Sequence, residues 1–465
     1  NGRYDGTSRF PRGKRYGFFP SFSAAYRISE EAFFEPLRKT VDNLKIRLSY
    51  GSLGNQQIGY YDFIQTITTK GSMGDYSFDG TILGQHATVS DPVSGNQTWE
   101  KVISKNLGAD LNMFSNRLSL TADFYIRDTK GILGKGKSLP SIYGANEPQV
   151  NSNNLRTKGY ELVLGWRDSF KLAGSTFSYG ITGTFSDYTA EYTKCDNPSG
   201  LIGGPYVGKK YGEIWGYKVD GLFRNDEEAA EYASRVDLSK VAAGYYSATG
   251  AYGKGVRGGD IKYLDLDGSG IVDGGKGTLE DPGDRRVIGN SSPRYQYGLT
   301  LNLSWYGFDL SVFMQGIGRL DWYPGADNLR FWGPYSRPYA TFIPKNFMSQ
   351  VWSESNPDAY LPRARAYTSL NSTQGTAYYT NDRYLQNLAY CRLKNLTLGY
   401  TIPKRLTSKV GIKECRVCFS GENLATWSAL KNDFLDPEQA AADSDKKSNV
   451  YPWCRTYSVG LNLTF

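Results

Sequence analysis

The feature that most constrains the fold is an alternation of apolar and polar residues with a period of two. Between residues 117 and 127, one set of alternate positions is apolar: Leu118, Leu120, Ala122, Phe124 and Ile126. Segment 297–305 repeats the pattern, with leucines that alternate with Thr300, Asn302 and Ser304. Because successive side chains of a strand point to opposite faces, both segments are predicted to be β-strands with one apolar face.

About eleven segments show this alternation, which predicts an all-β, antiparallel fold. They lie near residues 16–28, 43–52, 101–114, 116–128, 155–168, 175–188, 293–306, 307–318, 388–401, 412–425 and 455–465.

Composition and the placement of aromatic residues favour a transmembrane barrel over a soluble sandwich. No stretch approaches the roughly 18 apolar residues of a membrane helix. A barrel strand needs no such stretch, since only alternate side chains face lipid. Tyr and Trp bracket the apolar stripes at 297–305 and 160–166, as expected of side chains at a lipid–water interface. Aromatic residues make up 14% of the chain, and Gly is abundant at 53.

The connections between the predicted strands alternate in length. Short turns are expected at 115–116, 167–174, 306–307 and 403–411, with a medium one at 29–42, and long connections at 53–100, 129–154, 189–292, 319–387 and 426–454. Bacterial barrels place short turns in the periplasm and long loops outside the cell. The pattern therefore predicts long extracellular loops and a last strand that ends in the periplasm.

An eleven-strand piece is expected to need further strands to close, because bacterial barrels usually have an even strand number and an open edge in lipid is costly. Residues 1–15 read as a polar loop without an initial Met or a signal pattern. We therefore expect residues 1–465 to be the C-terminal portion of a barrel with its long loops, and the missing strands to precede Asn1.

The C-terminus carries the most specific short motif. Residues 458–465 alternate and end on Phe465, the last residue. With Gly460, Leu461 and Leu463, this strand resembles the outer-membrane sorting signal that the barrel-assembly machinery reads. The alternative is a plain edge strand that ends in Phe.

The loop 260–289 contains a pattern similar to an EF-hand. Asp265, Asp267, Ser269, Gly270 and Asp273 stand at positions 1, 3, 5, 6 and 9 of such a loop. Oxygen ligands at this spacing wrap a hard cation, and glycine at position 6 permits the sharp turn, so the prediction is a Ca²⁺ site on Asp265, Asp267, Ser269 and Asp273.

One departure weakens the match to a calcium loop. Lys276 stands at position 12, where a bidentate carboxylate belongs. Glu280, Asp281 or Asp284 is a candidate substitute. The alternative is a turn rich in Asp and Gly without a metal.

Other classes of function find little support. The single histidine, His86, has no paired nucleophile motif, so we predict no enzyme. The net charge of +8 fits a solvated basic surface, and no nucleic-acid-binding motif is present. Cys415 and Cys418 lie in one predicted strand and face opposite sides, which argues against a shared metal.

Substrate contacts are not identified by the sequence. Aromatic residues of the long loops are candidates to stack on sugars or peptide side chains, although packing within the loops explains them equally well. They are Trp215, Trp322, Tyr323, Trp332, Tyr335, Tyr378 and Tyr379.

Several stretches, in order along almost the whole chain, resemble the SusC/RagA family of TonB-dependent outer-membrane transporters. They are GFFPSFSAAYRISEEAFF (17–34), LKIRLSYGSLGNQQIG (44–59), NLGADLNMFSNRLSLTADFYIRDTKGIL (106–133), SSPRYQYGLTLNLSWYGFDLSVFMQG (291–316), RLKNLTLGYTIPKRL (392–406) and YPWCRTYSVGLNLTF (451–465).

This resemblance implies the second half of a 22-strand barrel, with a plug, a TonB-box segment and the first strands outside the present chain. It also implies a location in the outer membrane of a Gram-negative, Bacteroides-type bacterium. The implied activity is TonB-driven import of oligomeric nutrients, oligosaccharide before peptide, with a SusD-type surface lipoprotein as lid. The alternatives are a passive porin, which lacks a plug, and a soluble glycan-binding β-sandwich.

Overall fold

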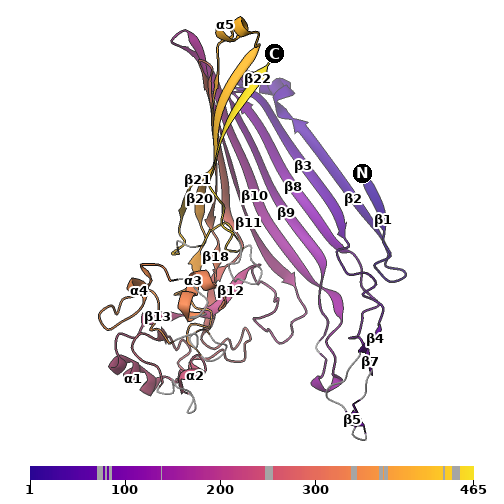
Figure 1. Ribbon diagram of the computed structural model, residues 1–465. Coiled ribbons are helices and arrows are strands. Elements are labelled where there is room, and N and C mark those ends of the chain that lie inside the picture. Colours follow the sequence, from indigo (N-terminus) through magenta and orange to yellow (C-terminus); the bar gives the residue numbers. More distant parts are fainter. Residues whose placement is uncertain are drawn as a thin grey trace.

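The computed structural model describes residues 1–70, 77–78, 81–82, 86–137, 139–246, 255–336, 343–365, 370, 375–432, 435–441 and 451–465. One curved antiparallel sheet of 12 strands dominates it (Figure 1). In sheet order the strands are β1 (Gly2–Gly6), β2 (Tyr16–Arg27), β3 (Val41–Asn55), β8 (Glu100–Met113), β9 (Leu118–Lys135), β10 (Gln149–Leu172), β11 (Ser175–Lys194), β16 (Arg294–Trp305), β17 (Phe308–Arg319), β20 (Tyr390–Thr401), β21 (Glu414–Ser428) and β22 (Thr456–Thr464).

All eleven predicted strands are confirmed, and neighbours in the sheet follow chain order. The prediction of a loop over residues 1–15 is wrong in part, because Gly2–Gly6 form β1. This segment lacks apolar alternation, and Gly and Asp favour strands poorly. Pairing with β2 holds it in place, with the ring of Tyr4 stacked on that of Tyr16 at 5.5 Å.

Strands β9 and β10 extend well beyond their apolar stripes. Half of the predicted long connection 129–154 is therefore strand, and residues 136–148 join β9 to β10. The residues beyond the stripes show no regular alternation of apolar and polar side chains, so the period-two signal ends before the backbone ladder does.

The two faces of the sheet differ in chemistry. Side chains of the predicted apolar stripes stay exposed on one face, with Leu48 53%, Leu107 48% and Phe124 54% accessible. The register places these three residues side by side on β3, β8 and β9. One continuous sheet with an exposed apolar face excludes the soluble sandwich, in which two sheets bury their apolar faces against each other.

The opposite, inner face carries charged side chains that pair between strands. The Arg47 guanidinium lies 2.9 Å from Asp110 and 3.0 Å from Asp123. Arg416 lies 2.5 Å from Asp309 in the same manner. The inner face is thus polar, with its charges largely compensated.

Short turns and long connections lie at opposite ends of the sheet, as predicted (Figure 1). Two turns have only two residues: Ala173 and Gly174 join β10 to β11, where the prediction gave the longer turn 167–174, and Tyr306 and Gly307 join β16 to β17, with φ of 49° and 81°. Positive φ at both central residues is the backbone of the two-residue hairpin that matches strand twist. This end also holds η1 (Ile28–Glu30), η2 (Ala32–Leu37), α5 (Lys404–Thr407) and η5 (Ser408–Val410).

At the other end, the described residues of three connections, 195–293, 320–389 and 429–455, pack into what we call the loop assembly. Its helices are α1 (Asp226–Arg235), α2 (Ala243–Tyr246), α3 (Leu329–Trp332), η4 (Gly333–Tyr335) and α4 (Phe347–Gln350). Its short strand pairs are β12 (Glu213–Tyr217) with β15 (Arg285–Asn290), β13 (Val219–Leu222) with β14 (Ile261–Tyr263), and β18 (Asp321–Trp322) with β19 (Gln386–Asn387).

The first two long connections stand apart from this assembly. Residues 56–99 hold β4 (Ile67–Lys70), β5 (Ser77–Phe78), β6 (Thr81–Ile82) and β7 (His86–Val89), and residues 136–148 hold η3 (Ser141–Tyr143). None of the helices that the structure describes is long and apolar enough to cross a membrane.

Candidate functional site

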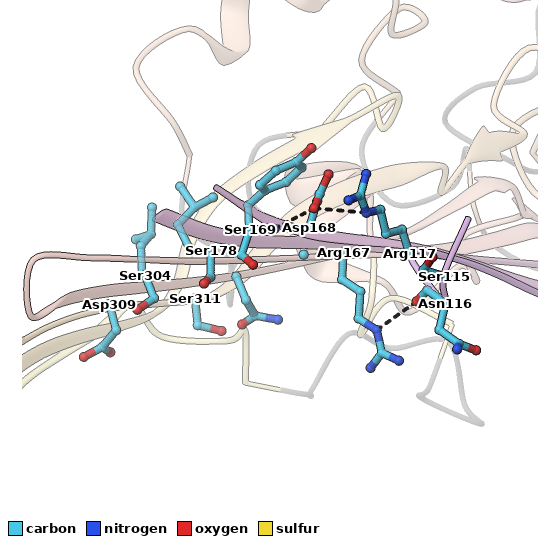
Figure 2. A pocket seen from close by; sticks show the side chains of 15 residues that line it. Ser115, Asn116, Arg117, Arg167, Asp168, Ser169, Ser178, Ser304, Asp309 and Ser311 are labelled. Carbon is cyan, nitrogen blue, oxygen red and sulfur yellow. Dashed lines mark hydrogen bonds and ion pairs between the residues drawn. The ribbon is translucent and has the colours of Figure 1, made fainter. Parts of the chain in front are cut away.

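A polar groove of about 820 Å³ runs across the inner face of the sheet near its short turns (Figure 2). Alternate residues of neighbouring strands line it, among them Ser169, Ser178, Ser304, Asp309 and Ser311. These are the polar positions of the period-two pattern, so the alternation that makes one face apolar makes the other face hydrophilic.

Ion pairs and backbone contacts hold the edge of this groove. Arg117 lies 3.3 Å from Asp168, and the Arg167 side chain donates to the backbone oxygen of Asn116 at 3.1 Å (Figure 2). The lining contains hydroxyls and charged groups but no imidazole or thiol among the described residues. Such a wall suits hydrated solutes or a polar protein segment.

The loop assembly has a hydrophobic core of its own. Trp332, Phe223, Val241, Ile261 and Leu388 are fully buried in it. A core of this kind is expected to keep the connections in one arrangement, whereas long loops without one are mobile.

Most of the candidate substrate-contacting aromatics belong to this core. Trp322, Tyr323, Trp332 and Tyr335 are at most 8% exposed, so packing within the loops accounts for them. Trp215 is half-buried, and its indole N–H donates to Glu213 at 2.7 Å. The residues that remain accessible are Tyr378, 39% exposed, and in part Tyr379. The sequence did not distinguish buried from exposed aromatics, because both occur in the same polar stretches.

Buried polar groups of the assembly bond to one another. The Asn381 amide donates to the Tyr323 hydroxyl at 3.1 Å and to the backbone oxygen of Tyr379 at 2.8 Å. Burial raises the pKa of Tyr263 and Tyr323 well above the usual range, so both phenols stay neutral donors. These bonds fix the core's geometry, since an unpaired buried polar group would be costly.

A buried ion pair joins two of the connections that form the assembly. The guanidinium of Arg365 lies 2.5 Å from the carboxylate of Asp260, and both side chains are at most 7% exposed. The Arg365 guanidinium also stacks over the Tyr245 ring, 4.1 Å from its centroid. Nothing in the sequence pattern indicated this pair, because the partners lie 105 residues apart.

The structure brings together two of the predicted calcium ligands and one substitute. Carboxylate oxygens of Asp265, Asp267 and Asp284 all lie within 4.8 Å of one another. Oxygens bound to one Ca²⁺ at 2.3–2.6 Å are at most about 5 Å apart, so this donor set has the right chemistry and spacing. Asp273 is outside this carboxylate group, and one of its oxygens accepts from Gly275 at 2.6 Å. The Ser269 hydroxyl donates to the backbone oxygen of Ile271 at 3.0 Å.

The same carboxylates also organise the loop through backbone hydrogen bonds. Asp284 is fully buried and accepts from the backbone N–H groups of Leu266 at 2.6 Å and Asp273 at 2.9 Å. Asp265 accepts from Gly268 at 2.8 Å and Gly270 at 2.9 Å. Asp284, one of the three candidate substitutes for position 12, therefore reaches the loop from 18 residues beyond Leu266.

The C-terminal strand presents its motif to the outer face. Leu461 and Leu463 on edge strand β22 are 60% and 41% exposed, and Phe465, directly after the strand, is 72% exposed. Gly460 lies on the opposite face, where a Cβ would come within 2.8 Å of the Cys418 sulfur. Cys415 pairs with Leu463 and Cys418 with Gly460, so the two cysteines face opposite sides, as predicted.

These features define a class of protein: a transmembrane antiparallel β-barrel wall with an apolar outer face, a polar inner face and a folded loop assembly at one end. Comparison with known proteins then gives the particular relationship. No family model matches the chain. Over its whole length the chain is 26% identical to TonB-dependent receptor P3 and 28% identical to TonB-dependent receptor P26, both of Formosa agariphila. It is 23% identical to TonB-dependent receptor SusC of Bacteroides thetaiotaomicron.

Solved structures agree on the fold. The chain superimposes over its full length on the RagAB peptide importer in the closed-closed state, with a TM-score of 0.70 and 20% identity. It matches the RagAB peptide transporter equally well, at 21% identity. The resemblance to the SusC/RagA family of TonB-dependent transporters is therefore confirmed.

The chain spans less than half the length of these relatives. It covers 43% of receptor P3, 44% of receptor P26 and 45% of the RagAB chain. What the whole protein does rests on more than this chain.

Proposed function

We propose that this chain is part of the wall and the extracellular loops of an outer-membrane importer that takes up oligomeric nutrients with energy supplied through TonB. It is not an enzyme in this proposal. The observation that carries it is the pairing of an exposed apolar outer face with a polar inner face on one sheet, capped at one end by a folded loop assembly. Contact with lipid requires the apolar outer face, and a hydrated path through the barrel requires the polar inner face. The folded loop assembly suits the capture of large solutes outside the cell.

The similarity to proteins named TonB-dependent receptors supports the energy coupling. The same similarity favours active import over passive diffusion through a porin. The plug and the TonB-binding segment that such an importer needs would belong to the remainder of the protein, and residues 1–465 would be the C-terminal portion of its barrel.

A SusD-type surface lipoprotein is the proposed partner. The loop assembly offers it a preformed surface, because its buried core and the Arg365–Asp260 pair keep three connections together. A rigid surface loses little conformational entropy when a lid docks.

Oligosaccharide is the proposed cargo. The accessible rings of Tyr378 and Tyr379 and the hydroxyl-lined inner groove suit sugars. Peptide is the second candidate, favoured by the fold shared with the RagAB peptide importer.

We also propose that Asp265, Asp267 and Asp284 bind Ca²⁺ and that the ion orders residues 265–284. Each carboxylate would give one oxygen ligand, and further ligands would come from backbone carbonyls or water. Val272, in the same loop, is fully buried in the core, so an ordered loop would stabilise the assembly.

Uptake in cells tests the proposed transport. A strain without the gene for the full protein should lose growth on its oligomeric nutrient, and a strain without TonB should lose it equally. Import that continues without TonB would show a passive pore. Growth of the deletion strain on oligosaccharides, with loss only on peptides, would shift the cargo to peptide.

A further inference from the structure

The outer face of the sheet carries a group of lysines just beyond its apolar band. Lys101 and Lys105 lie on β8, Lys130 on β9 and Lys158 on β10, and all four are exposed. The register of these three strands is uninterrupted here and puts the lysines on the same face as Leu107 and Phe124. We call these four residues the lysine patch.

Two lysines of the patch flank one apolar residue. Ile126 of β9 is directly opposite Lys105 on one side and Lys158 on the other. The next row toward the short turns is Leu107, Phe124 and Tyr160, where the ring centroids of Phe124 and Tyr160 lie 6.4 Å apart. The patch therefore begins where the apolar, aromatic band ends, at the level expected of lipid headgroups.

The other two lysines face each other directly. Lys101 and Lys130 are opposite partners in the antiparallel pair β8–β9. Like charges at directly opposite positions repel and destabilise a strand pair. An anion between them would convert this repulsion into two attractive contacts.

The carboxylates near the patch are already neutralised by other cations. Asp128 pairs with Arg156 at 2.6 Å, Asp187 with Arg294 at 2.6 Å, and Glu191 with Lys210 at 2.5 Å. In the part of the chain that the structure describes, no carboxylate lies within ion-pair distance of the four lysines. The four lysines thus have no ion-pair partner of their own among the described residues, although the Asp128 and Glu191 carboxylates attract Lys105, Lys130 and Lys158 from a greater distance.

A shallow groove connects the patch to the apolar band. Its volume is about 620 Å³, and its lining includes two lysines of the patch, Lys105 and Lys158, the apolar residues Leu107, Phe124, Ile126 and Tyr160, and the ion pair of Asp187 with Arg294. A ligand that fits has a negative head beside the lysines and an apolar tail on the leucine, isoleucine and rings below.

We infer that the lysine patch binds the phosphorylated headgroup of an outer-leaflet glycolipid, lipid A being the type, whose acyl chains lie along the groove. The inference rests on the proposed outer-membrane location. Lysine stems can lie on the apolar surface while their ammonium groups reach the phosphates. Charge complementarity and the adjoining apolar groove select a phospholipid-like ligand over a free anion, which would use only the lysines.

Lipid binding by the purified full-length protein tests this inference. Native mass spectrometry in detergent would compare bisphosphorylated lipid A, dephosphorylated lipid A and inorganic phosphate. We expect the wild-type protein to retain lipid A and the double variant Lys105→Gln/Lys158→Gln to bind it roughly 10- to 30-fold more weakly, from the usual contribution of a lysine at an anionic membrane surface. The dephosphorylated lipid should bind both proteins weakly.

The matched control removes two charges at the other end of the barrel. Lys404→Gln/Lys409→Gln changes two exposed lysines of the short-turn side and should leave lipid A binding unchanged. A second patch variant, Lys101→Gln/Lys130→Gln, should also weaken binding, which guards against a folding defect specific to the first pair.

Three results would overturn the inference: equal lipid A binding by the wild-type protein and both patch variants, equal binding of the dephosphorylated lipid, or displacement of lipid A by inorganic phosphate at equal concentration. Cell fractionation tests the proposed location separately. A protein found in the outer membrane that fails the lipid test would leave the transport proposal standing.

Discussion

The Arg47 side chain on β3 reaches Asp123 on β9, two strands away, with a guanidinium–carboxylate distance of 3.0 Å. The intervening position on β8 is Gly108, which pairs with both residues. A Cβ at Gly108 would lie 2.6 Å from the Asp123 carboxylate and 2.7 Å from the Arg47 guanidinium. Gly399 plays the same part beneath Arg416 and Asp309. The absence of a side chain at these positions lets charges pair across three strands of the inner face.

Gly108→Leu should therefore destabilise the barrel by about 1–3 kcal/mol, because the new side chain displaces the guanidinium and overfills the wall. Heat-dependent mobility of the folded protein on gels would measure the change. Gly51→Ala on the same face of β3 is the control, since its Cβ meets nothing within 4 Å. Equal stability of Gly108→Leu and the wild-type protein would show that the three-strand pairing contributes nothing.

Trp332→Ala should loosen the loop assembly while the barrel stays folded. Trp332 is fully buried, and its ring centroid lies 5.0 Å from that of Tyr384. Removal of a buried Trp costs about 3–5 kcal/mol. Hydrogen exchange should speed up in residues 320–389 and stay slow in β8–β11. Val207→Ala, at a 65% exposed position, should change neither. Unchanged exchange in Trp332→Ala would mean that the loops do not share one core.

The period-two pattern predicted the strands well because lipid and water impose opposite chemistry on alternate residues. It failed where that contrast ends. At Gly2–Gly6 and over residues 129–135, backbone pairing continues without a regular alternation of apolar and polar residues. The contacts between side chains of the loops could not be predicted from the sequence for a different reason. Asp260 and Arg365 meet only because two distant connections fold together, and no local periodicity records such a contact. Asp284 was one of three candidate substitutes in the sequence, and only the folded loop places its carboxylate beside that of Asp265.

The calcium proposal predicts a ligand-dependent stability. Ca²⁺ should slow hydrogen exchange in residues 265–284 of the full-length protein, and Asp265→Asn should weaken Ca²⁺ binding about tenfold or more, since each carboxylate is a charged ligand. Glu280→Gln is the control because Glu280 is outside the carboxylate group. If calorimetry detects no Ca²⁺ binding to the wild-type protein, the proposal is wrong, and the three aspartates only organise the loop through their backbone hydrogen bonds.

Phe465→Ala should lower the yield of assembled barrel several-fold, because the terminal aromatic is proposed to be read by the assembly machinery. Val459→Ala removes an apolar side chain from the same face of β22 at a motif position where the residue type is not specified, so its yield should stay normal. Pulse-chase assembly assays would compare the two. An equal defect in both would point to lost lipid contact as the cause, and normal yield of Phe465→Ala would refute the sorting role.

The orientation of the chain in the membrane is the central claim, and cysteine labelling in intact cells tests it most directly. In a variant of the full-length protein without its native cysteines, Met348→Cys places a thiol at a 71% exposed position of the loop assembly, and Asn116→Cys places one in the short turn between β8 and β9. An impermeant maleimide should label position 348 in intact cells and position 116 only after the outer membrane is opened. Labelling of position 116 in intact cells, or protection of position 348, would contradict this account.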